Sequence, residues 1–180
     1  MSKEIVVEIR PERPEDYAAI HEVNLAAFGE EGESLLIEKI RQSEDFIPGL
    51  SLVAVYDGQV VGHILFSLIR VAVPGRPDRE QAILSLAPMA VLPEFQGRGI
   101  GSAMVRRGLE IARELGHKAV VVVGHPDYYP RFGFSPARAK GLEAPFPVPD
   151  EAFMALELEP DGLEGLTGML VYPSAFDELN

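Results

Sequence analysis

Hydrophobic residues recur with two different spacings along the first half of the chain, and the spacing separates strands from helices. The pattern predicts a strand at 4–10, a helix at 15–28 that begins after Pro14, and a second helix at 33–42. Runs rich in β-branched residues then fill 51–73 on either side of Asp57 and Gly58. Because Asp-Gly between such runs is a strong signal for a tight turn, we expect an antiparallel hairpin there.

The second half of the chain alternates strand and helix patterns. We expect a strand at 82–91, a long helix at 99–115 and a buried strand at 118–123. This succession forms a crossover unit, so the two strands should be parallel. Pro88 interrupts the first strand, because proline gives no hydrogen to the ladder. The apolar face of the helix should hold Ile100, Met104, Ile111 and Leu115. The remaining expected strands are 152–159 and 168–173.

Composition indicates a water-exposed globular protein. The 180 residues are 47% hydrophobic and 24% charged, and the apolar runs are too short to cross a bilayer, so we expect no membrane partner. The length favours a single domain over 1–180. Without cysteine, neither a disulfide framework nor a cysteine nucleophile is available. The first residues do not have the pattern of a secretory signal, and we therefore expect a cytoplasmic location.

Charge is distributed unevenly within a formal net charge of −12. Residues 1–60 carry −8, residues 61–140 carry +5, and residues 141–180 carry −9. A strongly acidic exterior argues against nucleic-acid binding, which requires Lys and Arg to neutralise phosphates. The basic middle segment is suited to a small anion, although such segregation is also common as solubility patterning.

A glycine-rich turn stands immediately before the long helix, in the stretch AVLPEFQGRGIGSAMV at 90–105. The first amides of a helix have no intrahelical partner, so glycines there let the backbone close around a phosphate. A dinucleotide fingerprint would need glycine where Ser102 stands, and the Gly-Lys-Ser/Thr of nucleoside-triphosphate loops is absent. The alternative is a tight turn whose glycines only permit close packing.

Two motifs resemble those of the GNAT superfamily of N-acetyltransferases. Gln96, Gly99 and Gly101 reproduce its Gln/Arg-x-x-Gly-x-Gly/Ala signature, and YYPRFGF at 128–134 resembles its Tyr-x-x-x-Gly-Phe segment. The chain looks most like a branch of small bacterial predicted acetyltransferases. The resemblance implies an α/β fold with a mixed, mostly antiparallel twisted sheet flanked by helices. Two neighbouring parallel strands of that sheet would splay apart to form the acetyl-CoA cleft.

The resemblance also implies which residues hold acetyl-CoA as a cosubstrate. The backbone of one strand would pair with the pantetheine arm, and the glycine-rich turn would cradle the pyrophosphate with main-chain amides. The expected cofactor-binding residues are Met89, Ala90, Val91, Gln96, Gly97, Arg98, Gly99, Ile100, Gly101 and Ser102.

For catalysis, the resemblance gives Tyr129 the position of the family's general acid, with Tyr128 as the neighbouring alternative. A phenol is protonated at pH 7 and can donate to a departing thiolate. The other interpretation is that Tyr129 packs into the core beside Phe132 and Phe134. Neither expected parallel strand carries a carboxylate, so the general base is unassigned; His125 is the candidate proton acceptor, directly or through water.

The expected acceptor is an amine on a small molecule or a protein, attracted by the acidic flanks. Glu30, Glu31 and Glu33 are candidates for recognising it, because they lie near the first two helices that often border the family's acceptor site. The histidines do not have the spacing of metal ligands, so we expect no metal. A homodimer is left open, because 168–180 could complete the sheet or pack on a second subunit.

Direct transfer in a ternary complex is expected, because the chain has neither a cysteine nor a serine elbow to carry the acyl group. Two alternatives remain at this point. One is a CoA-binding sensor that has lost the chemistry, which the missing strand carboxylate favours. The other is transfer of a longer acyl chain.

Overall fold

The structure is a computed structural model that describes residues 5–75 and 80–179. The strands and helices are β1 Glu8–Pro11, α1 Tyr17–Phe28, α2 Gly32–Arg41, β2 Ser51–Tyr56, β3 Gln59–Ala72, β4 Glu80–Val91, α3 Ile100–Glu114, β5 Ala119–Val123, β6 Ser135–Pro136, β7 Leu142–Glu143, β8 Phe153–Glu157 and β9 Gly168–Val171. Short 3-10 turns lie at Pro14–Asp16, Pro48–Leu50, Pro93–Phe95, Tyr129–Phe132, Arg138–Lys140, Asp150–Ala152 and Ser174–Leu179.

Within the described ranges, nine strands form one mixed sheet flanked by helices, as the fold class predicted. Parallel pairing occurs between β4 and β5 and between β7 and β9, whereas β1, β2 and β3 pair antiparallel. The chain divides into two compact units. The first unit contains Met1–Ser67, Ala87–Ile111 and Ser174–Asn180, and the second contains Leu68–Leu86 and Ala112–Pro173. The expectation of a single domain stays a prediction.

The β2–β3 hairpin of the first unit forms where the sequence predicted it. Tyr56 pairs with Gln59, and the turn between them places Asp57 at φ 50° and Gly58 at φ 77°. Both angles lie in the left-handed region that Asp-Gly turns favour. β1 adds an antiparallel edge through Glu8 and Val55, so it starts later than the expected strand at 4–10; residue 4 lies outside the described range.

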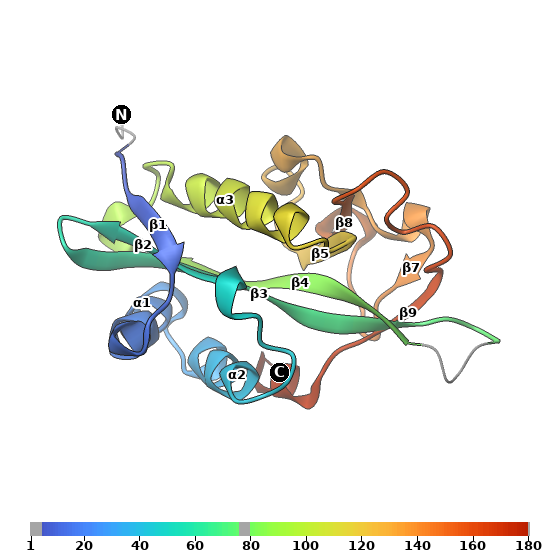
Figure 1. The fold of residues 1–180 in the computed structure, drawn as a ribbon, viewed down its shortest axis with the longest axis horizontal. Helices are drawn as coiled ribbons and strands as arrows, with labels where there is room; N and C mark the ends of the chain where they lie inside the picture. The colour runs from blue at the N-terminus through green and yellow to red at the C-terminus, as the bar shows by residue number, and fades with distance from the viewer. Residues whose placement is uncertain (1–4, 76–79, 180) are drawn as a thin grey trace. The chain divides into compact units, whose positions relative to one another are not determined.

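Helices α1 and α2 pack together on one side of β2 and β3 (Figure 1). Ile20 of α1 and Leu36 of α2 join Val53 and Leu65 in one buried cluster. The C-terminal turn Ser174–Leu179 packs on α2, where Lys39 and Glu178 form an ion pair. The C-terminal residues thus cover α2, whereas the oligomeric state stays a prediction.

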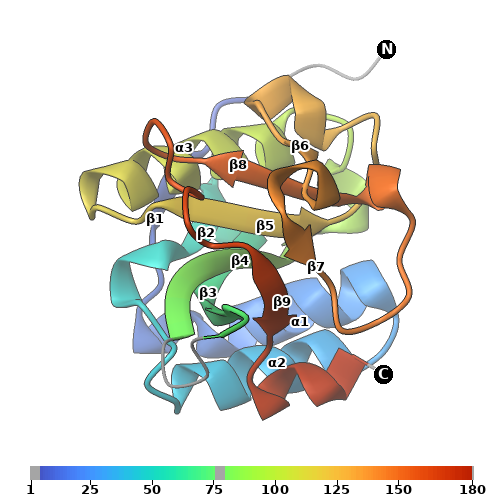
Figure 2. The ribbon, with the colours of Figure 1, turned by 90° about the vertical axis from the view of Figure 1, so that its right-hand side faces the viewer.

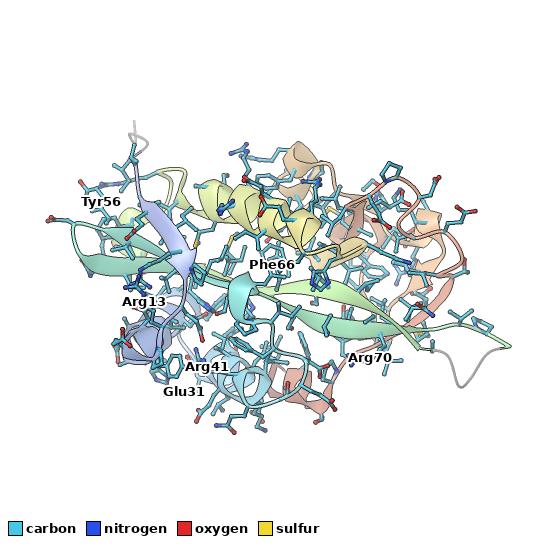
Figure 3. All side chains as sticks on the ribbon, viewed as in Figure 1. Arg13, Glu31, Arg41, Tyr56, Phe66 and Arg70 are labelled. Atoms are coloured by element: carbon cyan, nitrogen blue, oxygen red, sulfur yellow. The ribbon has the colours of Figure 1, made fainter. Side chains whose placement is uncertain are left out.

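Helix α3 packs on the opposite side of β3, and glycine makes the approach close (Figure 3). A Cβ on Gly108 would lie 2.1 Å from Cε1 of Phe66, and one on Gly62 would lie 3.0 Å from Cε of Met104. Because real Cβ atoms do not approach other atoms as closely as 2.1 Å, glycine at 108 allows α3 to seat directly on the Phe66 ring. This contact fixes the helix that directly follows the glycine-rich turn.

The second unit contains the crossover partner of β4. Leu84 pairs with Val120 and Ser85 with Val121, so the predicted parallel arrangement is confirmed. β8 pairs antiparallel with β5, and β9 pairs with the end of β3 and with β7 (Figure 2). The short strands β6 and β7 were not anticipated.

The predicted extent of α3 needs one correction. The helix ends at Glu114, and the side chain of Leu115 is 54% exposed instead of belonging to the apolar face. Gly116 at φ 85° reverses the chain directly after it, which turns Leu115 away from the buried side.

A buried polar cluster in the first unit joins residues that are distant in sequence. Arg41 donates two hydrogen bonds to Glu12, through Nε at 2.7 Å and Nη2 at 3.0 Å. The guanidinium also lies over the ring of Tyr17, with Cζ 3.8 Å from its centroid. Ser51 Oγ lies 2.5 Å from Glu12 Oε1 and 3.0 Å from His63 Nε2.

The cluster assigns the tautomer of His63. The single hydroxyl hydrogen of Ser51 is donated to the Glu12 carboxylate, so Ser51 Oγ must accept its second hydrogen bond from His63 Nε2–H. His63 Nδ1 is then an acceptor without a partner among the described residues. Complete burial lowers the pKa of His63 to about 4, although Glu12 opposes the shift and Arg41 adds to it.

Because burial disfavours the charged form of His63, we expect the folded protein to lose stability in acid. Between pH 6.5 and about pH 4, unfolded His63 binds a proton and folded His63 does not, so stability falls as pH falls through that range. The full effect is about 3 kcal/mol. We expect His63→Gln to flatten the dependence of unfolding free energy on pH, as measured by urea denaturation.

The slope of the unfolding free energy against pH is the quantity to compare, because the substitution also changes the absolute stability. His117, whose pKa is lowered by partial burial, contributes equally to both slopes. Equal slopes in the wild type and His63→Gln would show that His63 does not govern the acid limb.

Candidate functional site

The end of β4 and the turn after it form one continuous segment of the first unit. Met89 and Val91 are half-buried and Ala90 is buried. The 3-10 turn Pro93–Phe95 follows, and the side-chain amide of Gln96 then donates to the carbonyl of Val91 at 2.9 Å. Gln96 therefore folds back and fastens the turn to the strand end.

The glycines of the motif differ in what they permit. Gly97 at φ 77° and Gly99 at φ 83° occupy the left-handed region that side chains rarely adopt. Helix α3 then begins at Ile100, and Gly101 lies in its first turn. Ala103 donates its amide to the Gly99 carbonyl at 3.0 Å, so the amides of Ile100 and Gly101 precede the intrahelical ladder. This geometry presents main-chain donors at a helix N-terminus and suits an anion such as phosphate.

Arg98 lies between these glycines and is partly shielded from solvent. Its Cζ is 5.7 Å from the centroid of the Phe95 ring, which in turn lies 5.8 Å from the ring of Tyr56. Tyr56 ends β2 at the tip of the hairpin (Figure 3). The sequence signature did not include Tyr56, although its place beside the Asp-Gly turn was predictable.

In the second unit, Tyr129 begins the 3-10 turn Tyr129–Phe132 and is only 8% exposed. Its ring packs edge-on against Tyr128 and Phe134, with centroids 5.0 and 5.7 Å away. Within the described chain, its hydroxyl forms no hydrogen bond. Burial, followed by the proximity of Tyr128, raises the pKa of Tyr129 to about 12. The phenol is therefore protonated across the neutral range. The Tyr129 ring also packs against its aromatic neighbours, independently of any chemistry that its hydroxyl performs.

Gly124 fixes the position of the Tyr129 ring. A Cβ at residue 124 would lie 2.4 Å from Cε2 of Tyr129 and 3.0 Å from Cδ2. Gly124 is not recognisable as part of the site from the sequence, because nothing in the order of residues shows that a glycine five positions upstream faces the ring.

His125 is exposed, and its backbone has a clear structural task. Its carbonyl accepts the amide of Tyr128 at 3.1 Å and that of Tyr129 at 3.5 Å. Arg131 adds a second brace, because its Nε donates to the Tyr128 carbonyl at 3.0 Å and its guanidinium stacks on the Tyr128 ring at 4.5 Å. A catalytic role for the His125 imidazole stays a prediction.

The predicted site residues therefore fall into two groups. The segment from Met89 to Ser102 belongs to the first unit, while His125 and Tyr129 belong to the second. Of the acidic candidates for amine recognition, Glu31 Oε2 lies 3.6 Å from His21 Nε2, and Glu33 Oε1 is buried without a hydrogen-bond partner among the described residues.

Among the described residues, no three His, Cys, Asp or Glu side chains are grouped so that they could hold a metal ion. No helix in the described ranges has the length and apolar character needed to cross a membrane.

Comparison with known proteins places these features in a family. The model of the acetyltransferase (GNAT) family matches residues 15–134. YjhQ of Escherichia coli, named as an uncharacterized N-acetyltransferase, is 44% identical over 137 residues, which are 76% of this chain and 74% of YjhQ. YhbS of the same organism, also named as an uncharacterized N-acetyltransferase, is 34% identical over 94% of this chain and 98% of its own.

Two solved structures extend the similarity to the fold. The crystal structure of YhbS in complex with CoA has a TM-score of 0.87 and 32% identity, covering 98% of this chain and 95% of that one. A GNAT acetyltransferase from Brucella melitensis in complex with acetyl-CoA has a TM-score of 0.77 and 34% identity, with coverage of 96% and 99%.

The contact between Gly124 and Tyr129 predicts the effect of one methyl group. Gly124→Ala should displace the Tyr129 ring and cost about 1–3 kcal/mol of unfolding free energy. In the double variant Gly124→Ala/Tyr129→Ala, the ring is absent and the added methyl should cost much less than it does alone. A double-mutant cycle by chemical denaturation measures this coupling. Additive effects of the two substitutions would show that the contact is unimportant.

Proposed function

Because the chain belongs to the acetyltransferase (GNAT) family, we propose that it transfers an acetyl group from acetyl-CoA to a primary amine by direct transfer in a ternary complex. The observation that carries this proposal is the glycine-rich turn at the start of α3, where Gly97 and Gly99 open the backbone and the amides of Ile100 and Gly101 precede the helical ladder. The CoA and acetyl-CoA complexes of the two solved relatives support the same ligand here.

In this proposal, the backbone of Met89, Ala90 and Val91 pairs with the pantetheine arm, and a main-chain amide of that strand polarises the thioester carbonyl. The pyrophosphate binds the amides of 97–102, and Arg98 adds positive charge. Gln96 acts indirectly, because its side chain is already engaged by the Val91 carbonyl.

Tyr129 is the proposed donor to the leaving sulfur. The amine nitrogen attacks the carbonyl carbon, the carbon–sulfur bond breaks, and the phenol donates a hydrogen bond to the developing thiolate. Full proton transfer from a phenol with a pKa of about 12 to a thiolate is uphill, because thiols have pKa values of about 8.5. Stabilisation of charge on the sulfur is therefore the main contribution of Tyr129, and solvent supplies the final proton.

The part of β4 that the sequence predicted as a strand, 82–91, contains no carboxylate to accept the proton lost by the amine, and neither does β5; the one acidic residue of β4 is Glu80, at its first position. His125 is the proposed acceptor, through a water molecule, because it is exposed and its backbone braces the turn that holds Tyr129.

The second candidate is a CoA-binding sensor without catalytic activity, favoured by the lack of a carboxylate in 82–91 of β4 and in β5. Release of free CoA thiol from acetyl-CoA, followed with a thiol reagent across primary amines and basic peptides, separates the two. The chain has no cysteine and so adds no background. Amine-dependent release supports the transferase. CoA binding without release across the panel supports the sensor.

Tyr129→Phe should lower kcat by about 10- to 100-fold, because it removes a hydrogen bond to a developing negative charge while keeping the ring. The KM for acetyl-CoA should change little. Tyr128→Phe is the matched control one residue away and should retain most of the activity. If the two variants turned over equally fast, Tyr129 would have no role as the donor.

Gly101→Val should weaken CoA binding at least about tenfold, because the branched side chain obstructs phosphate from reaching the first-turn amides. Ala103→Val places the same side chain in the same helix, one residue beyond the cradle segment 97–102. Calorimetric titration with CoA compares them. Similar affinities for the two variants would assign Gly101 a purely structural role.

A further inference from the structure

The segment before β1 contacts the glycine-rich turn. The amide of Ile5 donates a hydrogen bond to the carbonyl of Arg98 at 3.3 Å. Both residues belong to the first unit, and Figure 1 shows the segment before β1 rising beside the connection into α3. Val6 is 93% exposed, so apolar burial of that side chain does not hold the segment in place.

This contact matters because of the peptide that it engages. In a planar trans peptide, the C=O and the N–H point in opposite directions. The carbonyl of Arg98 and the amide of Gly99 belong to one such peptide. When Ile5 holds the carbonyl on one side, the Gly99 N–H is directed to the other side. That amide forms no hydrogen bond to any of the described residues, so it is available to a ligand.

The same peptide is otherwise easy to rotate. Gly97 and Gly99 flank Arg98, and without a Cβ they resist a peptide flip less than any other residue. Gln96 fastens the turn upstream through Val91, and the Ala103 amide holds the Gly99 carbonyl downstream. Between the Gln96 and Gly99 contacts, the Ile5 amide is the main-chain group that holds the Arg98 carbonyl.

We propose that the Ile5 amide is a positioning group for the phosphate cradle, which keeps the Gly99 N–H directed toward the pyrophosphate of CoA. The inference rests on the proposed CoA site and adds a contact from outside the sequence signature. Ile5 acts through the Arg98–Gly99 peptide and does not touch the reacting atoms.

Ile5→Pro tests this proposal, because proline has no amide hydrogen. Ile5→Ala keeps the N–H and removes most of the side chain, and Val6→Pro places the same ring one residue away without removing the Ile5 donor. Two ligands are compared by calorimetry: CoA, and pantetheine, which has no phosphate. We expect Ile5→Pro to weaken CoA binding about three- to tenfold, the usual effect of one hydrogen bond. Pantetheine binding and the affinities of both control variants should remain near wild type.

The outcomes separate the proposal from its alternatives. Equal weakening of CoA and pantetheine binding by Ile5→Pro would overturn it, because a general loss of structure affects both ligands. Matching losses in Val6→Pro would also overturn it. If the wild type binds CoA but does not release thiol with any amine, the transferase proposal fails while this inference stands. If the wild type does not bind CoA, both fail.

Discussion

The amides of Ile100 and Gly101, which precede the intrahelical ladder of α3, are the constraint on which the rest of the proposed site depends. A helix N-terminus presents donors that the helix itself does not satisfy, and their usefulness depends on how rigidly the helix is held. Here α3 seats on Phe66 through Gly108, where even a Cβ would collide with the ring. The donors of Ile100 and Gly101 thus belong to a helix that is anchored in the core about two turns later. Glycines at different positions thus serve two tasks: Gly108 permits packing on β3, and Gly97 and Gly99 shape the turn that is proposed to bind the anion.

Glycine makes the turn itself flexible, whereas Gly108 helps to hold α3 in place. Gly97 and Gly99 make the left-handed conformations possible, but they also leave the backbone between them free to rotate. The surrounding contacts compensate: Gln96 on Val91, Phe95 against Tyr56, and Ile5 on Arg98. A cradle of main-chain amides needs both properties, since the ligand must approach closely and the donors must already be oriented.

The sequence predicted best where local chemistry decides the structure. Asp57-Gly58 determined a turn, and the succession of strand, helix and strand determined parallel pairing of β4 with β5. It predicted poorly where the partners are distant in sequence. Nothing in the local pattern around His63 indicates that Ser51 and Glu12 converge on it, and its apolar neighbours suggested only an ordinary strand position. The exposure of Leu115 shows a related limit, because helical spacing alone does not locate the last turn. The site motifs were found through their glycines and aromatics, whereas the braces Gly124 and Ile5 are visible only in three dimensions.

Burial keeps His63 and Tyr129 neutral near pH 7 by the same physical effect, although it shifts their pKa values in opposite directions. It disfavours the imidazolium of His63 and the phenolate of Tyr129 alike, because each is the charged form of its group. His63 is thereby a poor proton acceptor, despite its free Nδ1, and Tyr129 is a hydrogen-bond donor with little tendency to ionise. Under the proposed reaction, the amine must then reach the thioester already neutral or lose its proton through water to His125, the proposed acceptor. At pH 7 only about one in a few thousand lysine-like amines is neutral, compared with about one in ten α-amino groups. Because 82–91 of β4 and all of β5 lack a carboxylate, an amine with a low pKa would place the smallest demand on the proposed proton acceptor.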